Sequence, residues 1–279
     1  MRAIRRWLWA AGVLASAACG LGGWAFCVEP GMLVTRENAL ELPDWPVECT
    51  GLRVAVLADL HVGSPFNGLA RLETVVQRTQ QAAPDLVLLA GDYVIQGVRG
   101  GRFETPETMA RVLAGLEAPA GVYAVLGNHD WWLDAPRVQK ALESASIGVL
   151  EDRAVEIRHG TCRFWLAGVS DFLEGRHDVR AALQDVPADA AVLVLTHNPD
   201  VLGQVPARVA LTIAGHTHGG QVRIPGLGRP IVPSRFGQRY AIGHIVEDGR
   251  HLFVSPGIGT SILPVRFLVP PEISLLTLR

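Results

Sequence analysis

In the sequence LRVAVLADLH (residues 52–61), a short apolar run with two β-branched residues leads directly into Asp59 and His61. This pattern predicts a buried strand over residues 52–58. The strand would deliver polar side chains at its C-terminal end, where ligands bind in sheets of parallel strands.

Outward from this strand, helical and strand-like patterns alternate. Residues 67–82 carry an apolar stripe at helical spacing, and residues 105–116 begin with Thr-Pro-Glu, a helix start. Residues 85–90 and 121–126 are predicted strands, so the order implies right-handed crossovers and a largely parallel sheet. Further strands are predicted at residues 155–158, 162–168, 191–196, 209–214, 241–246, 251–255 and 273–278.

Five short polar clusters each follow one of these apolar runs. They are Asp59-Leu60-His61, Gly91-Asp92, Gly127-Asn128-His129-Asp130, Thr196-His197-Asn198 and Gly215-His216-Thr217-His218. A single Asp-x-His or Gly-Asp is more typical of a turn or cap, but five such clusters at strand ends indicate a site. Carboxylates, an amide and imidazoles without a thiolate suit Mn²⁺, Fe or Zn²⁺.

The N-terminal segment is apolar. Residues 7–28 contain no charged side chain and follow Arg2, Arg5 and Arg6. A helix of this length spans roughly 30 Å of hydrocarbon, which predicts a membrane anchor over residues 1–29. The arginines favour a cytoplasmic N-terminus and therefore an extracytoplasmic domain. A cleaved signal peptide is the alternative, because the run is rich in Gly and Ala.

Chain length, net charge and cysteine spacing limit the expected number of domains and the expected classes of partner. The 279 residues suit one large domain, expected at 51–279, and the aperiodic residues 30–50 are expected to be a linker. A formal net charge of -2 gives no basic field, so no nucleic-acid partner is expected. The four cysteines have no C-x-x-C spacing, so neither a thiolate metal site nor a disulfide framework is indicated, and a Cys49 to Cys162 bridge stays open.

The order D-x-H, G-D, G-N-H-D, H and G-H-T-H resembles the motifs of the calcineurin-like metallophosphoesterases, from Leu52 to the C-terminus. The sequences GHTHGGQV (215–222), SPGIGT (255–260) and PPEI (270–273) resemble its bacterial membrane-linked branch of YkuE and YaeI type. The resemblance implies an α/β fold, a four-layer α/β/β/α sandwich with two mixed β-sheets, preceded by an N-terminal transmembrane helix. With the arginines, it implies a single-pass protein of the bacterial inner membrane.

The resemblance also implies two divalent metal ions and the residues that hold them. The implied ligands are Asp59, His61 and His218 for one ion, Asn128, His197 and His216 for the other, and Asp92 as the bridge. His129 would face the substrate and neutralise phosphoryl charge or protonate the leaving alkoxide, with Asp130 orienting its ring.

Several residues near these motifs have two interpretations. Trp131 and Trp132 could line the entry for an apolar substrate group or pack in the core. Arg223, Arg235 and Arg239 could reach a second phosphate or a sugar, or simply be solvated.

The implied activity is hydrolysis of a phosphodiester, pyrophosphate or phosphomonoester by a metal-bridging hydroxide. The resembling branch includes pyrophosphatases that act on UDP-diacylglucosamine in lipid A synthesis, so a lipid-linked substrate is one expectation. An extracytoplasmic lipid phosphate is equally expected, because a nucleotide sugar would be found inside the cell. The alternatives are a membrane-tethered metal-binding scaffold without turnover, which does not need His129, and an amidohydrolase, whose His-x-His placement is not seen.

Overall fold

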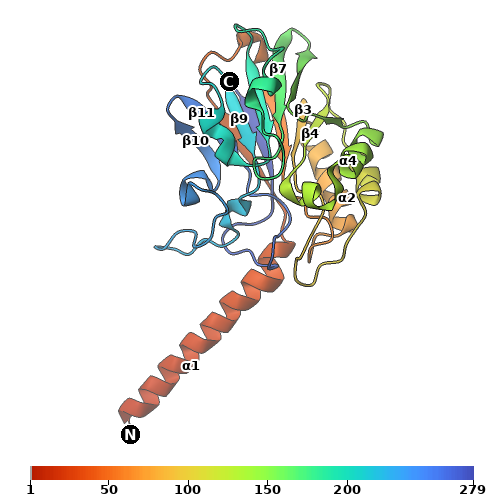
Figure 1. Cartoon of the computed structure of the whole chain (residues 1–279). Helices are drawn as coiled ribbons and strands as arrows, with labels where there is room; N and C mark the ends of the chain where they lie inside the picture. Colours follow the sequence, from red (N-terminus) through yellow and green to blue (C-terminus); the bar gives the residue numbers. More distant parts are fainter. Residues whose placement is uncertain (1) are drawn as a thin grey trace.

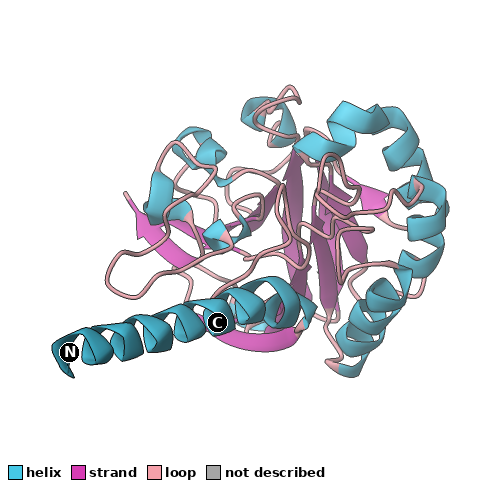
Figure 2. Cartoon of the chain, turned by 90° about the horizontal axis from the view of Figure 1, so that it is seen from below, coloured by secondary structure: helices cyan, strands magenta, loops and turns pink. Residues whose placement is uncertain are grey.

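The structure, a computed structural model, describes residues 2–279 of the chain. Two six-stranded sheets pack face to face, helices cover their outer faces, and one long helix projects from the domain (Figure 1, Figure 2). The family resemblance predicted this α/β fold with two mixed sheets, and the structure confirms it.

The first sheet has the strand order β1-β12-β2-β3-β4-β5. Its strands are β1 (Val34–Leu40), β12 (Glu272–Leu278), β2 (Leu52–Leu57), β3 (Leu86–Ala90), β4 (Val122–Val125) and β5 (Gly148–Val149). β2 to β5 are mutually parallel, whereas β12 is antiparallel to β2 and parallel to β1. The parallel core of this sheet was predicted from the alternation of strands and helices.

The second sheet has the order β10-β11-β9-β8-β7-β6. Its strands are β10 (Gly243–Glu247), β11 (Arg250–Val254), β9 (Leu211–Ala214), β8 (Val192–Thr196), β7 (Cys162–Val169) and β6 (Arg153–His159). β11, β9, β8 and β7 are parallel, and the edge strands β10 and β6 are antiparallel to their neighbours.

β2 shows why the strands are apolar on both faces. Val54 and Val56 belong to the core between the two sheets, while Ala55 and Leu57 belong to the core between the first sheet and its helices. All four side chains are fully buried. A strand covered on both faces has no solvent side, which explains the continuous apolar run in its sequence.

Helices form the two outer layers. α2 (Leu69–Gln81), α3 (Pro106–Leu113) and α4 (Asn128–Ser144) cover the first sheet, with buried contacts from Leu72, Met109 and Val138. The outer face of the second sheet is covered by α5 (Val179–Ala182) and by the 3-10 helix η4 (Pro199–Gln204), which share a third apolar cluster. The first sheet therefore carries most of the helical cover.

Residues 30–50 are not a plain linker, and that expectation was wrong. The segment contains β1, which pairs along its whole length with β12 and so belongs to the first sheet. As an edge strand it has one neighbour, and Arg36 and Glu37 in its middle are exposed. An edge strand of this kind lacks the apolar run by which the inner strands were recognised.

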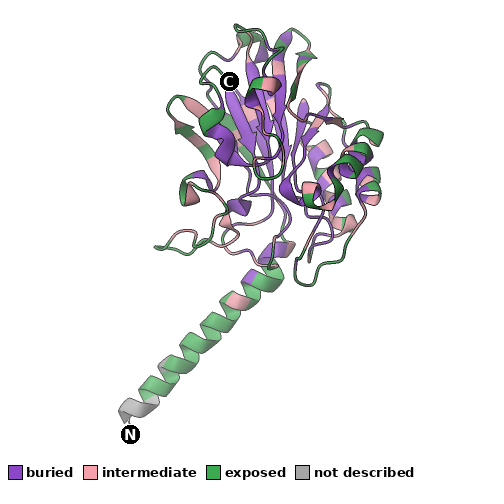
Figure 3. Ribbon diagram, viewed as in Figure 1, coloured by how far each residue is buried: buried purple, intermediate pink, exposed green. Residues whose placement is uncertain are grey.

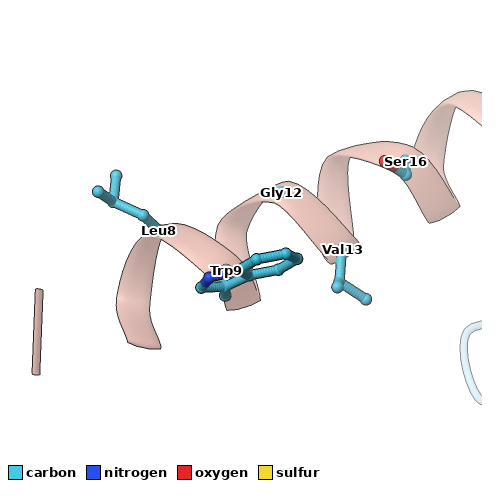
Figure 4. A pocket seen from close by; sticks show the side chains of 5 residues that line it. All are labelled: Leu8, Trp9, Gly12, Val13 and Ser16. Carbon is cyan, nitrogen blue, oxygen red and sulfur yellow. The ribbon is translucent and has the colours of Figure 1, made fainter. Parts of the chain in front are cut away.

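The N-terminal helix α1 (Arg2–Gly23) continues through a π-turn, η1 (Trp24–Val28), and a 3-10 turn, η2 (Glu29–Gly31). The span from Arg6 to Gly31 is long and apolar enough to cross a membrane. Residues 6–9 and 11–21 of this span and of α1 are exposed (Figure 3). Leu8, Trp9 and Val13 project from this helix and are largely exposed (Figure 4).

A disulfide links Cys49 to Cys162, which are 113 positions apart in the sequence. The sequence had left this bridge open, and the structure contains it. Cys49 ends the short 3-10 helix η3 (Val47–Cys49) before β2, and Cys162 begins β7. The bridge therefore ties the segment that enters the first sheet to a strand of the second sheet.

Replacing Cys49 and Cys162 together by Ser should lower the free energy of unfolding by about 2 to 5 kcal/mol, because the bridge restricts the unfolded chain. Denaturant unfolding of the detergent-solubilised chain, followed by tryptophan fluorescence, measures this loss. The matched control replaces Cys19 and Cys27, which are exposed and unbridged. Equal unfolding midpoints for the two double variants would contradict a stabilising bridge.

Candidate metal centre

The five polar clusters meet at one edge of the two sheets. They follow the carboxyl ends of β2, β3 and β4 in the first sheet and of β8 and β9 in the second. The seven candidate ligands are all buried: Asp59, His61, Asp92, Asn128, His197, His216 and His218. Since the strands within each sheet run parallel there, their ends bring side chains from distant sequence positions together.

Five of these seven residues have a left-handed backbone. The φ angles are 49° for Asp59, 39° for His61, 56° for Asp92, 70° for His216 and 52° for His218. Non-glycine residues in this region each cost of order 1 to 3 kcal/mol, and such strain concentrates at functional sites. The tight turns let neighbouring residues on one strand end point into the same space.

Asp59, His61 and His218 form one group of donor atoms. The Nε2 atoms of His61 and His218 lie 3.1 Å apart, and His218 Nε2 lies 3.7 Å from Asp59 Oδ1. The three residues could hold a metal ion together. The Asp59 carboxylate also accepts hydrogen bonds from the His216 backbone N–H at 3.0 and 3.1 Å, which fixes its direction.

Asp92, His197 and His216 form a second group. Asp92 Oδ2 lies 3.3 Å from His197 Nε2, and His197 Nε2 lies 3.1 Å from His216 Nδ1. The same Asp92 oxygen lies 3.5 Å from His61 Nε2 in the first group. Asp92 is thus the side chain that both groups share.

The donor set fits a pair of cations. His61 Nδ1 faces the Val94 carbonyl and His197 Nδ1 faces the Ala90 carbonyl, so each ring donates there and keeps a lone pair on Nε2. The two Nε2 lone pairs point at other ring nitrogens and at the Asp92 carboxylate, which are also potential metal ligands, inside a buried site. The Asn128 Oδ1 atom, at the first residue of α4, is buried without a hydrogen-bond partner among the described residues. Bound cations would give the Nε2 lone pairs and the Asn128 Oδ1 atom the partners that they lack.

Burial favours the neutral imidazoles that bind metal ions. It lowers the pKa of His61 to about 4 and that of His216 to about 3, and it also lowers the pKa of His218. Burial disfavours the charged forms of both Asp92 and His197. Their mutual attraction outweighs this effect, so the pKa of Asp92 is held well below its usual value and the pKa of His197 well above. A cation can replace the proton of this pair.

His129 lies beside the candidate ligands at the second position of α4. Its backbone N–H donates to Asp92 Oδ1 at 2.9 Å, and its ring meets the His61 ring edge to face at 4.7 Å between centroids. Trp132 covers the other side, with its ring 4.8 Å from that of His129, and is half exposed. Trp131 instead packs against the core of the first sheet. Of the two interpretations of this pair, core packing therefore applies to Trp131 and a position beside the site applies to Trp132.

Asp130 does not orient the His129 ring, and that expectation was wrong. Its carboxylate accepts backbone hydrogen bonds at 2.9 Å from Asp92, Tyr93 and Gly127, so it is fully engaged with the chain on either side of Asp92. His129 Nδ1 has no partner among the described residues. Asp130 is therefore a positioning residue for Asp92. The direction of its side chain follows from the start of α4, which sequence spacing does not reveal.

Two glycines let the strand ends approach this closely. A Cβ atom on Gly91 would lie 2.7 Å from both the Gly127 nitrogen and His197 Nδ1. A Cβ atom on Gly127 would collide with the Asp92 carboxylate. Both positions are therefore restricted to Gly by lack of space beside the site.

Arg266 is a buried residue whose role the sequence did not indicate. Its guanidinium donates to the carbonyls of Pro256 and Gly257 at 3.0 and 3.1 Å, and also to that of Gly259. Gly259 in turn donates to the Asp59 carbonyl at 2.7 Å. The SPGIGT sequence thus forms a loop against Asp59, and Arg266 holds this loop in place.

With this geometry described, comparison with known proteins identifies the family. The model of the calcineurin-like phosphoesterase family matches residues 52–220, more than half of the chain. The chain belongs to this family. It is therefore a metal-dependent phosphoric ester hydrolase, of a family that depends on two metal ions.

Three relatives match this calcineurin-like phosphoesterase over most of its length. The uncharacterized metallophosphoesterase YkuE of Bacillus subtilis is 30% identical and covers 96% of this chain and 94% of its own. The phosphodiesterase YaeI of Escherichia coli is 31% identical, with 98% of each chain covered. The UDP-2,3-diacylglucosamine pyrophosphatase LpxG of Chlamydia trachomatis is 26% identical, with 91% of each chain covered.

Replacing Asp130 by Asn should weaken metal binding of this phosphoesterase roughly 10- to 100-fold, because an amide cannot accept all the N–H bonds that position Asp92. Titration of the metal-free protein with Mn²⁺ measures the change. Asp134→Asn is the control, because this exposed residue of the same helix only accepts a bond from Arg137. Unchanged Mn²⁺ affinity in Asp130→Asn would show that Asp130 does not position Asp92.

Metal binding should release protons and should tighten as the pH rises through about 7. Burial raises the pKa of Asp59 to about 7, and Asp92 holds the pKa of His197 well above its usual value. Below these pKa values both groups carry protons that a cation must displace. Calorimetric titration with Mn²⁺ at two pH values, in buffers of different ionisation enthalpy, counts the protons. A pH-independent affinity without proton release would contradict this expectation.

Proposed function

We propose that this protein hydrolyses a phosphodiester or pyrophosphate bond with two divalent cations held at the edge of its sheets. The observation that carries the proposal is the Asp92 carboxylate, which lies within 3.5 Å of ring nitrogens from both groups of donor atoms. Asp59, His61 and His218 would hold one cation, Asn128, His197 and His216 the other, and Asp92 both.

When bound, the two cations would lower the pKa of an attacking water and withdraw charge from the phosphoryl oxygens. Oxygen and nitrogen donors without a thiolate suit Mn²⁺, Fe or Zn²⁺. The protein's own part is to hold these donors rigidly. The buried turns and the Asp130 hydrogen bonds supply that rigidity without any change during the reaction.

His129 would act on the phosphoryl group itself. Burial lowers the pKa of His129, which keeps its ring neutral and available as a hydrogen-bond donor to an anionic substrate. The ring lies between the buried His61 and the half-exposed Trp132, where a substrate could reach it. There its neutral ring can donate a hydrogen bond that stabilises charge on the phosphoryl oxygens.

The protein would act at a bacterial inner membrane, with its domain on the extracytoplasmic side. α1 is long and apolar enough to cross the bilayer, and arginines precede its apolar run. The Cys49–Cys162 disulfide supports an oxidising compartment. The relative LpxG is named for a lipid-linked diphosphate, which supports a lipid-linked substrate for this chain too.

The full chain should hydrolyse bis-p-nitrophenyl phosphate in the presence of Mn²⁺, and chelation should abolish the activity. His129→Ala should lower kcat by roughly a hundredfold or more while metal content stays the same, because a hydrogen-bond donor to the phosphoryl group is lost and the ligands remain. Release of p-nitrophenol and elemental analysis of the same samples give both readings. Full activity after chelation, or loss of metal from the His129 variant, would overturn the assigned roles.

A further inference from the structure

The sheet topology places the N-terminal helix at the same edge as the metal centre. β12 is antiparallel to β2, and β1 is parallel to β12. β1 therefore begins at the edge where β2 ends. Only Met32 and Leu33 separate η2 from β1, so α1 must leave the domain beside the strand ends that carry the candidate ligands, as Figure 1 shows.

The joint between α1 and the domain is fixed by buried polar contacts. Glu29 is 3% exposed, and its carboxylate accepts hydrogen bonds from Trp24 Nε1 at 2.8 Å and from the Val269 backbone N–H at 2.6 Å. The Arg266 backbone N–H donates to the Ala25 carbonyl at 2.9 Å. Because η1 and η2 continue α1 without a loop, these contacts set the direction of the whole helix relative to the domain.

Exposed apolar side chains gather in two loops beside this joint. They are Ile224, Leu227 and Ile231 in one loop and Ile262, Leu263 and Leu268 in the other, between 38% and 77% exposed. We call these six residues the anchor-side face. The loop of residues 223–231, drawn in light blue in Figure 1, is largely exposed (Figure 3).

Hydrogen bonds connect the two loops of the anchor-side face with each other and with the site. Arg223 N–H donates to the Phe267 carbonyl at 2.8 Å, and Ser261 N–H donates to Gln221 Oε1 at 2.7 Å. Gln221 is three residues from His218. One residue, Thr260, separates the loop of residues 261–268 from Gly259, which donates to the Asp59 carbonyl. The anchor-side face therefore borders the metal centre.

The charge of these loops is opposite in sign to that of the whole chain. Residues 221–243 contain four arginines and no Asp or Glu, and one of them, Arg239, pairs with Glu247 at 3.1 Å. Residues 255–271 contain only Arg266, which is buried, so the exposed positive charge lies in the first segment. The whole chain has a formal net charge of -2. Arg223 is exposed between the candidate metal ligand His218 and Ile224. Apolar side chains flanked by arginines are typical of surfaces that rest on anionic lipid.

We propose that the anchor-side face rests on the bilayer that holds α1, so that the metal centre opens at the lipid–water interface. The substrate would then be a phosphate ester carried on a membrane lipid, with its phosphate at headgroup level. This inference rests on the proposed function for the reaction, but the position of the face on the membrane can be measured separately. The bilayer is the occupant because α1 emerges beside this face in a fixed direction.

Fluorophore labelling in bilayers tests the position of the face. In a background with Cys19 and Cys27 replaced by Ala, Leu227→Cys and Ile262→Cys carry an environment-sensitive label in phosphatidylcholine–phosphatidylglycerol proteoliposomes. Val246→Cys is the matched control, because it is 57% exposed but lies in β10 opposite His251, away from the carboxyl edge. Labels at 227 and 262 should be quenched by spin-labelled lipids, and the label at 246 should not.

Two results of this labelling would overturn the proposal. Labels at 227 and 262 that stay as accessible to water as the label at 246 would show that the face does not meet the bilayer. Labels that are shielded from water but not quenched by spin-labelled lipid, with energy transfer between copies, would instead assign the face to self-association.

Activity on two substrates with the same leaving group tests the consequence for catalysis. One is bis-p-nitrophenyl phosphate in solution, and the other is a diacylglycerol phosphodiester of p-nitrophenol in vesicles. Leu227→Asp with Ile262→Asp should lower the ratio of vesicle to solution activity at least about tenfold, since burial of each apolar side chain is lost. Val246→Asp should leave the ratio unchanged.

The two proposals fail in different ways. If the unaltered chain does not hydrolyse the soluble ester, the proposed function fails, whatever the labels show. If it hydrolyses the soluble ester but the double variant keeps the full activity ratio, the proposed function stands and the membrane-facing site is overturned.

Discussion

The Asp92 carboxylate is the contact on which the rest of the site depends. It lies 3.5 Å from His61 Nε2 and 3.3 Å from His197 Nε2, which come from different sheets. Asp130 holds the backbone of Asp92 at 2.9 Å, and the absence of a side chain at Gly127 leaves room for its carboxylate. Without this shared anion, only the Asp59 carboxylate would balance two bound cations, and the second group would have no negative charge of its own.

The packed strands and helices stabilise the fold enough to offset the strained and charged residues of the site. Five residues with left-handed backbones, at three strand ends, and several buried charges concentrate at one edge, and each is costly by itself. The strands behind them are buried on both faces and form continuous apolar cores with the helices and with the opposite sheet. Rigid strands therefore hold strained ends, which is how a site gains fixed geometry before any ligand arrives.

The sequence predicts the inner strands and the meeting of the polar clusters, because each inner strand is an apolar run that ends in polar residues. It does not predict β1, since an edge strand with Arg36 and Glu37 exposed lacks that pattern. Nor does it reveal whether Cys49 meets Cys162, or that Asp130 turns toward Asp92 and away from His129. These features depend on three-dimensional direction, which residue spacing alone does not encode.

Arg266 connects the candidate metal centre with the base of α1. Its guanidinium holds the loop that packs on Asp59, while its backbone contacts Ala25 at the base of α1. A fully buried arginine is costly unless its donors find acceptors, and each of its three guanidinium nitrogens donates to a carbonyl here. An apolar side chain could fill the same volume but could not bind those carbonyls. The same residue therefore holds the loop beside Asp59 through its side chain and contacts the base of α1 through its backbone.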